Sequence, residues 1–94
     1  MQESRIEFYF KKQIEKIGGK AFKLVSPGTT GVPDRMVLLP LGNIIFVEMK
    51  APGKKLRPIQ VHRVNQIRSL GFRVEVIDCK EEVDRFVRSV NKIE

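Results

Sequence analysis

The sequence predicts a single α/β domain in which a small mixed sheet is flanked by helices, in the order α-β-β-β-α-β-α. Its 94 residues are the length of one domain, and 41% hydrophobic with 31% charged residues is a globular composition. Apolar residues recur at helical spacing in some segments and form short runs or alternate in others. We therefore expect residues 1–94 to form one domain with this element order.

The first half of the chain predicts one helix followed by three strands. In residues 3–17 apolar side chains recur every three to four positions, and a Gly-Gly pair then ends the helix. A turn-rich PGTTGVPD loop separates the first two strands, and an LPLGN turn separates the next two. The third strand is the most apolar, as expected at the centre of a sheet. The three strands are expected at residues 21–26, 35–39 and 44–50.

The second half predicts a helix, a strand and a final helix. Pro58 suits the first turn of a helix that runs to Leu70. Residues 72–77 alternate apolar and charged side chains, which is typical of a half-exposed strand. Asp78 with Glu81 resembles a capping box at the start of the last helix.

Cysteine content and hydropathy exclude several classes of protein. Cys79 is the single cysteine and His62 the single histidine, which excludes a disulfide framework within one chain and a Cys/His zinc site. No apolar run approaches the ~18 residues that a membrane span needs. The N-terminus carries acids and bases where a signal peptide would be apolar. We expect a soluble, intracellular protein.

The charge balance suggests a polyanionic partner. Eighteen Lys and Arg against eleven Asp and Glu leave a formal net charge of +7, and each phosphate that such a surface neutralises releases counterions. Excess lysine can also serve solubility alone. The placement of the acids is therefore more informative than the net charge.

Two acids and a lysine converge at one end of the predicted sheet. Glu48 and Lys50 point to the same face of their strand, and a hairpin centred near residues 41–42 brings Asp34 opposite roughly this segment. Two carboxylates at that separation can bind a hard cation such as Mg²⁺, which can activate an attacking water and stabilise the leaving oxygen. Lys50 can orient or deprotonate that water, or neutralise the developing charge. The alternative is a strand-end salt bridge.

Two further acids lie near the start of the first helix. At ~100° per residue Glu3 falls within the apolar stripe, and Glu7 lies about 40° away one turn on. An inward carboxylate is costly unless it is paired or bound to metal. A helix end that projects beyond the core would leave both acids solvated, and for these two residues alone that interpretation is favoured.

These residues resemble the signature of the PD-(D/E)XK nucleases. Val32-Pro33-Asp34 is followed, after thirteen intervening residues, by Glu48-Met49-Lys50. The strings GVPDRMVLLPLGNIIFVEMKAPGKKLRPIQ and LGFRVEVID closely resemble the stand-alone, virus-type VRR-NUC proteins of that superfamily, and the similarity covers nearly the whole chain. The resemblance implies a restriction-endonuclease-like core and an endodeoxyribonuclease that depends on Mg²⁺ or Mn²⁺.

The resemblance also implies roles for individual residues. Asp34 and Glu48 match the metal ligands, the backbone carbonyl of Met49 is an expected extra ligand, and Lys50 matches the catalytic lysine. Gln60 matches a glutamine that lies near the site.

The family also carries a glutamate on its first helix, close to the catalytic site. The register counted back from Gly18-Gly19 favours Glu3 as this site acid and metal ligand, and Glu7, one turn away, is the alternative.

Basic residues after the catalytic strand predict DNA contacts. Lys54, Lys55 and Arg57 follow that strand directly, so they should lie beside the active site and hold DNA phosphates. Arg63 can extend this track along the next helix, and Arg35 can touch the DNA backbone near the site.

The resemblance further implies a homodimer that cuts branched DNA such as Holliday junctions, because a two-fold dimer supplies two symmetric incisions. Phe8 and Tyr9 lie off the core stripe and are candidate dimer contacts, although neighbouring side chains can equally cover them. Flaps, nicks or plain duplex are alternative substrates, and a non-catalytic DNA-binding module is the rival reading. We expect a phage setting in the cytoplasm of a bacterial host, with no membrane partner and no nucleotide cofactor.

Overall fold

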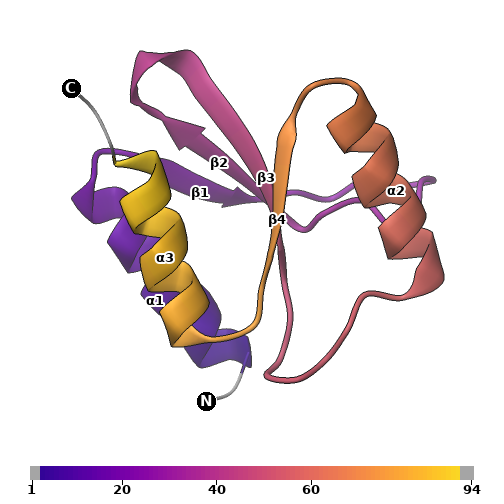
Figure 1. The fold of residues 1–94 in the computed structure, drawn as a ribbon, viewed down its shortest axis with the longest axis horizontal. Coiled ribbons are helices and arrows are strands. Elements are labelled where there is room, and N and C mark those ends of the chain that lie inside the picture. The colour runs from indigo at the N-terminus through magenta and orange to yellow at the C-terminus, as the bar shows by residue number, and fades with distance from the viewer. Residues whose placement is uncertain (1–2, 92–94) are drawn as a thin grey trace.

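The element order of the protein is the predicted α-β-β-β-α-β-α. The structure is a computed structural model that describes residues 3–91, and the side chains of residues 4–91. The elements are α1 (Glu3–Lys16), β1 (Lys20–Lys23), β2 (Arg35–Leu39), the 3-10 turn η1 (Pro40–Gly42), β3 (Asn43–Met49), α2 (Pro58–Ser69), β4 (Arg73–Ile77) and α3 (Lys80–Val90) (Figure 1). Across the described range, no helix is long and apolar enough to cross a membrane.

The four strands form one mixed sheet in the order β1-β2-β3-β4. The β1–β2 and β2–β3 pairs are antiparallel, and β3 pairs with β4 in parallel. The three-residue turn η1 closes the β2–β3 hairpin, with Leu41 in the left-handed region at φ 68°. Leu39 thus pairs with Asn43 and Arg35 with Val47. Extending this ladder by one position places Asp34 opposite Glu48.

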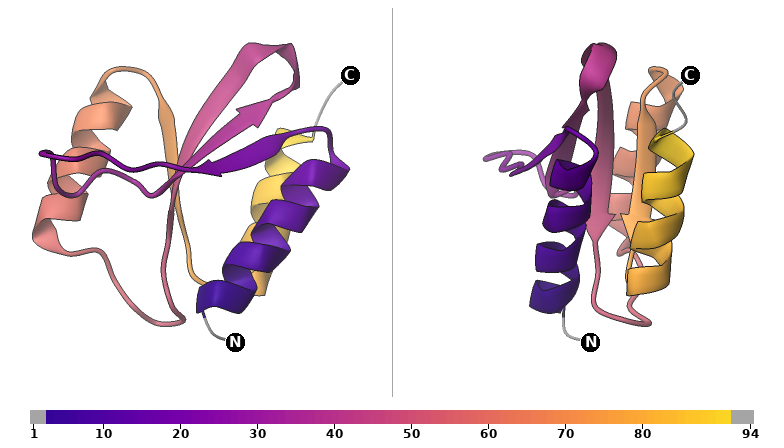
Figure 2. Two further views of the ribbon diagram at one scale, coloured as in Figure 1. Left: turned by 180° about the vertical axis from the view of Figure 1, so that it is seen from behind. Right: turned by 90° about the vertical axis from the view of Figure 1, so that its left-hand side faces the viewer.

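The two faces of the sheet carry different partners. Helices α1 and α3 pack side by side on one face, and α2 lies on the other side of the sheet (Figure 2). Because side chains alternate along a strand, β3 directs Val47 and Met49 to the α1–α3 face and Glu48 to the α2 face. The main core lies on the α1–α3 face and consists of Ile6, Phe10, Ile14, Val37, Ile45, Val47, Met49, Ile77, Val83 and Phe86.

Two local expectations were wrong. The first strand ends at Lys23, where its pairing with β2 stops at Arg35, and not at residue 26. The expected capping box does not form, because α3 starts at Lys80 with Cys79 as its N-cap and has no side-chain cap. The Asp78 carboxylate instead accepts a hydrogen bond from the Gly53 N–H at 3.2 Å, so it tethers the loop after β3.

Of the two candidate dimer contacts, Tyr9 is engaged within its own chain. Its hydroxyl donates to Asp84 Oδ1 on α3 at 2.5 Å, and Lys80 Nζ lies 5.1 Å from the centre of its ring. The hydrogen bond to the Asp84 carboxylate raises the pKa of Tyr9 above its usual 10.0, because it stabilises the protonated phenol. Phe8, by contrast, is 63% exposed.

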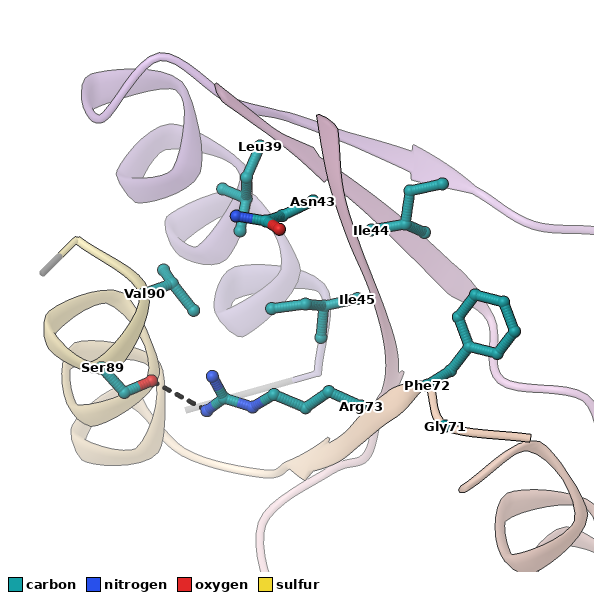
Figure 3. A pocket seen from close by; sticks show the side chains of 9 residues that line it. All are labelled: Leu39, Asn43, Ile44, Ile45, Gly71, Phe72, Arg73, Ser89 and Val90. Carbon is teal, nitrogen blue, oxygen red and sulfur yellow. Dashed lines mark hydrogen bonds between the residues drawn. The ribbon is translucent and has the colours of Figure 1, made fainter. Parts of the chain in front are cut away.

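A shallow hollow lies at the far end of the sheet from Asp34. It opens between the starts of β3 and β4 and the end of α3, where Arg73 reaches across to donate to Ser89 Oγ at 2.8 Å (Figure 3). Asn43 lines this hollow, whereas Glu48 lies near the other end of the same strand. The hollow is therefore separate from the predicted acid cluster.

Candidate active site

The open end of the β2–β3 hairpin holds two carboxylates together through backbone amides. The Asp34 N–H donates to Glu48 Oε1 at 3.1 Å, and the Met49 N–H donates to Asp34 Oδ1 at 3.0 Å. The hairpin register dictates this arrangement, because it sets the residue before β2 opposite the penultimate residue of β3. The convergence of Asp34 with Glu48 expected from the sequence is confirmed.

Glu48 is a buried carboxylate with several donors. Its side chain is 8% exposed, and Oε2 accepts from Gln60 Nε2 at 3.2 Å and lies 3.8 Å from Lys50 Nζ. A buried carboxylate is tolerated when hydrogen bonds and an opposite charge compensate for its lost hydration. The sheet therefore presents Glu48 and Lys50 together, as their spacing predicts.

Gln60 is oriented by the start of α2. Its Oε1 accepts from the Arg57 N–H at 2.8 Å, as one half of a capping box would do. A backbone N–H requires an acceptor, so the amide oxygen is committed to Arg57 and the amide nitrogen faces Glu48. The cap that begins the helix thus aims a donor into the site.

Arg35, a candidate DNA contact, has a largely buried side chain. It is 8% exposed and lies on the α1 side of the sheet, opposite Val47. Its Nη2 lies 2.8 Å from Glu7 Oε1, and its Nη1 lies 3.4 Å from Asp34 Oδ2 and donates to the Asp34 carbonyl at 2.9 Å. The expected contact of Arg35 with the DNA backbone stays a prediction, and in this structure its guanidinium is engaged by Glu7 and Asp34.

Glu7 therefore reaches the site through Arg35. Its side chain is 29% exposed, which places this first-helix acid between the solvated and the buried alternatives. The side chain of Glu3, the other candidate, lies outside the described residues. The link from Glu7 to Asp34 was not foreseen, and its one sequence signal is an arginine directly after Pro33-Asp34.

The predicted DNA track divides into exposed and anchored residues. Lys54, Lys55 and Arg57 are exposed on the loop that follows β3. Arg63 is half-buried, and its Nε donates to the Thr30 carbonyl at 3.0 Å, so it ties the loop before Asp34 to α2. His62 is exposed.

The donor set suits a hard divalent cation that keeps part of its water shell. Asp34 and Glu48 supply carboxylate oxygens, and Mg²⁺ is commonly held by one or two carboxylates with water and substrate phosphate completing its shell. Within the described side chains, no group of three or more His, Cys, Asp or Glu residues could hold a metal ion. The cluster carries one net negative charge, which favours a cation. Its three carboxylates are Glu7, Asp34 and Glu48, and its two positive side chains are Arg35 and Lys50.

The sequence comparison decides the family. The VRR-NUC domain model matches residues 5–81. The chain belongs to the VRR-NUC family. This VRR-NUC chain is also 48% identical over 81 residues to the protein named "Putative nuclease p44" of Acyrthosiphon pisum secondary endosymbiont phage 1, a match that covers 86% of this chain and 87% of that protein.

A solved structure described as a VRR_NUC domain has the same fold. It aligns with this VRR-NUC chain at a TM-score of 0.86 and 36% identity, and covers 92% of this chain and 94% of its own. Both the resemblance and the fold class expected from the sequence are confirmed.

Proposed function

We propose that this VRR-NUC domain is a divalent-metal-dependent endonuclease that hydrolyses phosphodiester bonds in DNA. The observation that carries the proposal is the contact between Asp34 and Glu48, with Lys50 3.8 Å from Glu48. Carboxylates repel a polyanion unless a cation lies between them, so an acid cluster in a chain of net charge +7 is hard to explain by DNA binding alone. Membership of a nuclease domain family supports the same activity.

The chain's own residues have distinct roles in this proposal. Asp34, Glu48 and the Met49 carbonyl would hold Mg²⁺ or Mn²⁺. A divalent cation bound there supplies Lewis-acid stabilisation of the charge that develops on the phosphate. Lys50 lies beside Glu48 and can donate a hydrogen bond to the attacking water or neutralise charge on the phosphate. Gln60 keeps the Glu48 carboxylate in place.

The bond changes are those of direct hydrolysis. The oxygen of one water forms a bond to phosphorus as the P–O3′ bond breaks, without a covalent enzyme intermediate. The 3′ oxygen takes up a proton, which leaves a 5′-phosphate and a 3′-hydroxyl.

We further propose that the substrate is branched DNA and that the acting species is a homodimer. The described chain presents one Asp34–Glu48 pair, whereas symmetric resolution of a four-way junction needs two incisions. Phe8, 63% exposed on α1, is available for a dimer contact. Flaps, nicks and plain duplex would use the same chemistry.

Incubation with a labelled four-way junction and a matched linear duplex, in Mg²⁺, Mn²⁺ or EDTA, tests this function. We expect paired symmetric nicks in the junction that disappear in EDTA and in Asp34→Asn. Equal cutting of the duplex would retain the nuclease and discard the junction preference. Tight binding without cleavage in either metal would instead establish a non-catalytic DNA-binding module.

Replacing Lys54 and Lys55 together by alanine should flatten the salt dependence of DNA binding. Both side chains are exposed on the loop after the catalytic strand. The log–log slope should fall by about one unit for each lost phosphate contact. Fluorescence anisotropy across a salt series measures the slope.

The matched control replaces Lys16 and Lys20 by alanine, which removes the same charge. Both lysines are exposed near the end of the β1–β2 pair that lies away from Asp34. An equal change in both double variants would mean that net charge alone sets the slope, and would place the DNA track elsewhere.

A further inference from the structure

Arg35 joins two carboxylates that belong to different elements. One nitrogen of its guanidinium, Nη2, lies 2.8 Å from Glu7 on α1, and a second, Nη1, lies 3.4 Å from Oδ2 of Asp34, the residue before β2. The Arg35 side chain is 10% exposed, so these interactions are largely removed from water. A cation this buried is retained only where its partners compensate for its lost hydration.

The rigid guanidinium of Arg35 links the position of the Glu7 carboxylate to that of the Asp34 carboxylate. The group is planar and its nitrogens form a rigid fork. Once Glu7 holds Nη2, the direction of Nη1 is set, and Nη1 also donates to the Asp34 carbonyl at 2.9 Å. The other oxygen of the Asp34 carboxylate, Oδ1, is held by the Met49 N–H at 3.0 Å. One oxygen of this carboxylate therefore accepts a backbone hydrogen bond, and the other lies within ion-pair distance of Arg35.

We propose that Glu7 and Arg35 are positioning residues, in which Glu7 holds the Arg35 guanidinium and Arg35 holds the Asp34 carboxylate in the orientation that binds the divalent cation. The inference rests on the proposed function, because it assumes that Asp34 is a metal ligand. It gives Glu7 an indirect role that runs through Arg35, in place of direct contact with the metal.

The metal affinity of Arg35 variants distinguishes a positioning role of Arg35 from the effect of its charge. Removing the Arg35 charge alone should strengthen cation binding, because like charges repel. Loss of positioning should weaken it, and loss of an outer-shell partner typically costs about 10- to 100-fold in metal affinity or activity. We therefore expect Arg35→Met to bind Mn²⁺ about 10- to 100-fold more weakly. Arg35→Lys, which keeps the charge and loses the fork, should be impaired to a similar degree.

A double-mutant cycle then tests whether Glu7 acts through Arg35. Titration calorimetry with Mn²⁺ in the absence of DNA, and cleavage kcat, are measured for Glu7→Gln, Arg35→Met and the double variant. Coupled residues depart from additivity, so Glu7→Gln should impair the native protein and have no further effect beside Arg35→Met. Equal losses in both backgrounds would make Glu7 a direct ligand and overturn the inference.

An ion pair outside the site controls for the general effect of losing such a pair. Glu82 and Arg85 lie 2.7 Å apart on the exposed side of α3, and the corresponding Glu82→Gln and Arg85→Met should leave Mn²⁺ binding unchanged. If Arg35→Met does not fold, Glu7→Gln and Arg35→Lys carry the test, and unchanged Mn²⁺ affinity in both overturns the inference. An active Asp34→Asn would overturn the proposed function itself, whereas an inactive Asp34→Asn beside unaffected Glu7 and Arg35 variants overturns this inference alone.

Discussion

Glu48→Gln should reduce DNA cleavage by more than about 100-fold, because loss of an outer-shell partner already costs about 10- to 100-fold and Glu48 is proposed as a ligand itself. The substitution removes a charged oxygen donor with almost no change of volume. Its amide oxygen can still accept the Asp34 N–H, but its amide nitrogen would then face two other donors, Gln60 Nε2 and Lys50 Nζ. Single-turnover cleavage in Mg²⁺ and in Mn²⁺ measures the loss.

DNA binding by this variant should persist or strengthen, because removal of a carboxylate reduces repulsion of the phosphates. Stability should fall by about 1–3 kcal/mol, the usual cost of unsatisfied buried polar groups, which urea denaturation measures. The control is Glu75→Gln, since Glu75 lies on the edge strand β4 and pairs with Arg73 at 2.9 Å. Cleavage by Glu48→Gln within tenfold of the native rate would remove Glu48 from the catalytic site.

Gly31→Ala should lower both stability and cleavage, the latter by about 100-fold, because a displacement of 1 Å can cost about that much in rate. Gly31 has φ +85°, and a Cβ there would lie 2.7 Å from the Ile59 carbonyl oxygen. At this point the loop that leads to Asp34 approaches the first turn of α2, which carries Gln60. Relief of the clash would move one or both of them away from Glu48.

The matched control is Gly28→Ala in the same loop. Gly28 has nearly the same φ, +83°, but open space where the Cβ would lie. Both variants pay the backbone cost of a left-handed alanine, about 1–2 kcal/mol, so the difference between them isolates the contact with Ile59. Thermal melts and single-turnover cleavage measure the two effects. Equal losses in both variants would show that the close approach to α2 does not position the site.

Local pattern was sufficient for most of the fold. The helices follow from apolar spacing, and Pro or Gly residues bound α1 and α2, which are signals within a few positions of the chain. Cap chemistry was less predictable. Asp78 has the expected residue type for an N-cap, yet its carboxylate bonds to Gly53 on a loop that the sheet brings beside it.

The Asp34–Glu48 pair and its link to Lys50 were determined by the sequence itself. A hairpin register depends on the length of its turn, and strand alternation then decides which side chains share a face. Both are properties of one contiguous segment. The same reasoning explains why Glu48 and Lys50 were expected together.

The family resemblance placed Gln60 near the site, but only the tertiary structure decided which groups Arg35, Glu7 and Gln60 contact. Arg35 meets Glu7 because α1 packs against the face of the sheet to which Arg35 points, and Gln60 meets Glu48 because α2 packs against the other. Neither helix position can be obtained from periodicity, since an apolar stripe shows that a helix is packed but not which polar residue it will meet. The sequence thus determined the two carboxylates and the lysine, and the packing of two helices on opposite faces decided what holds them in place.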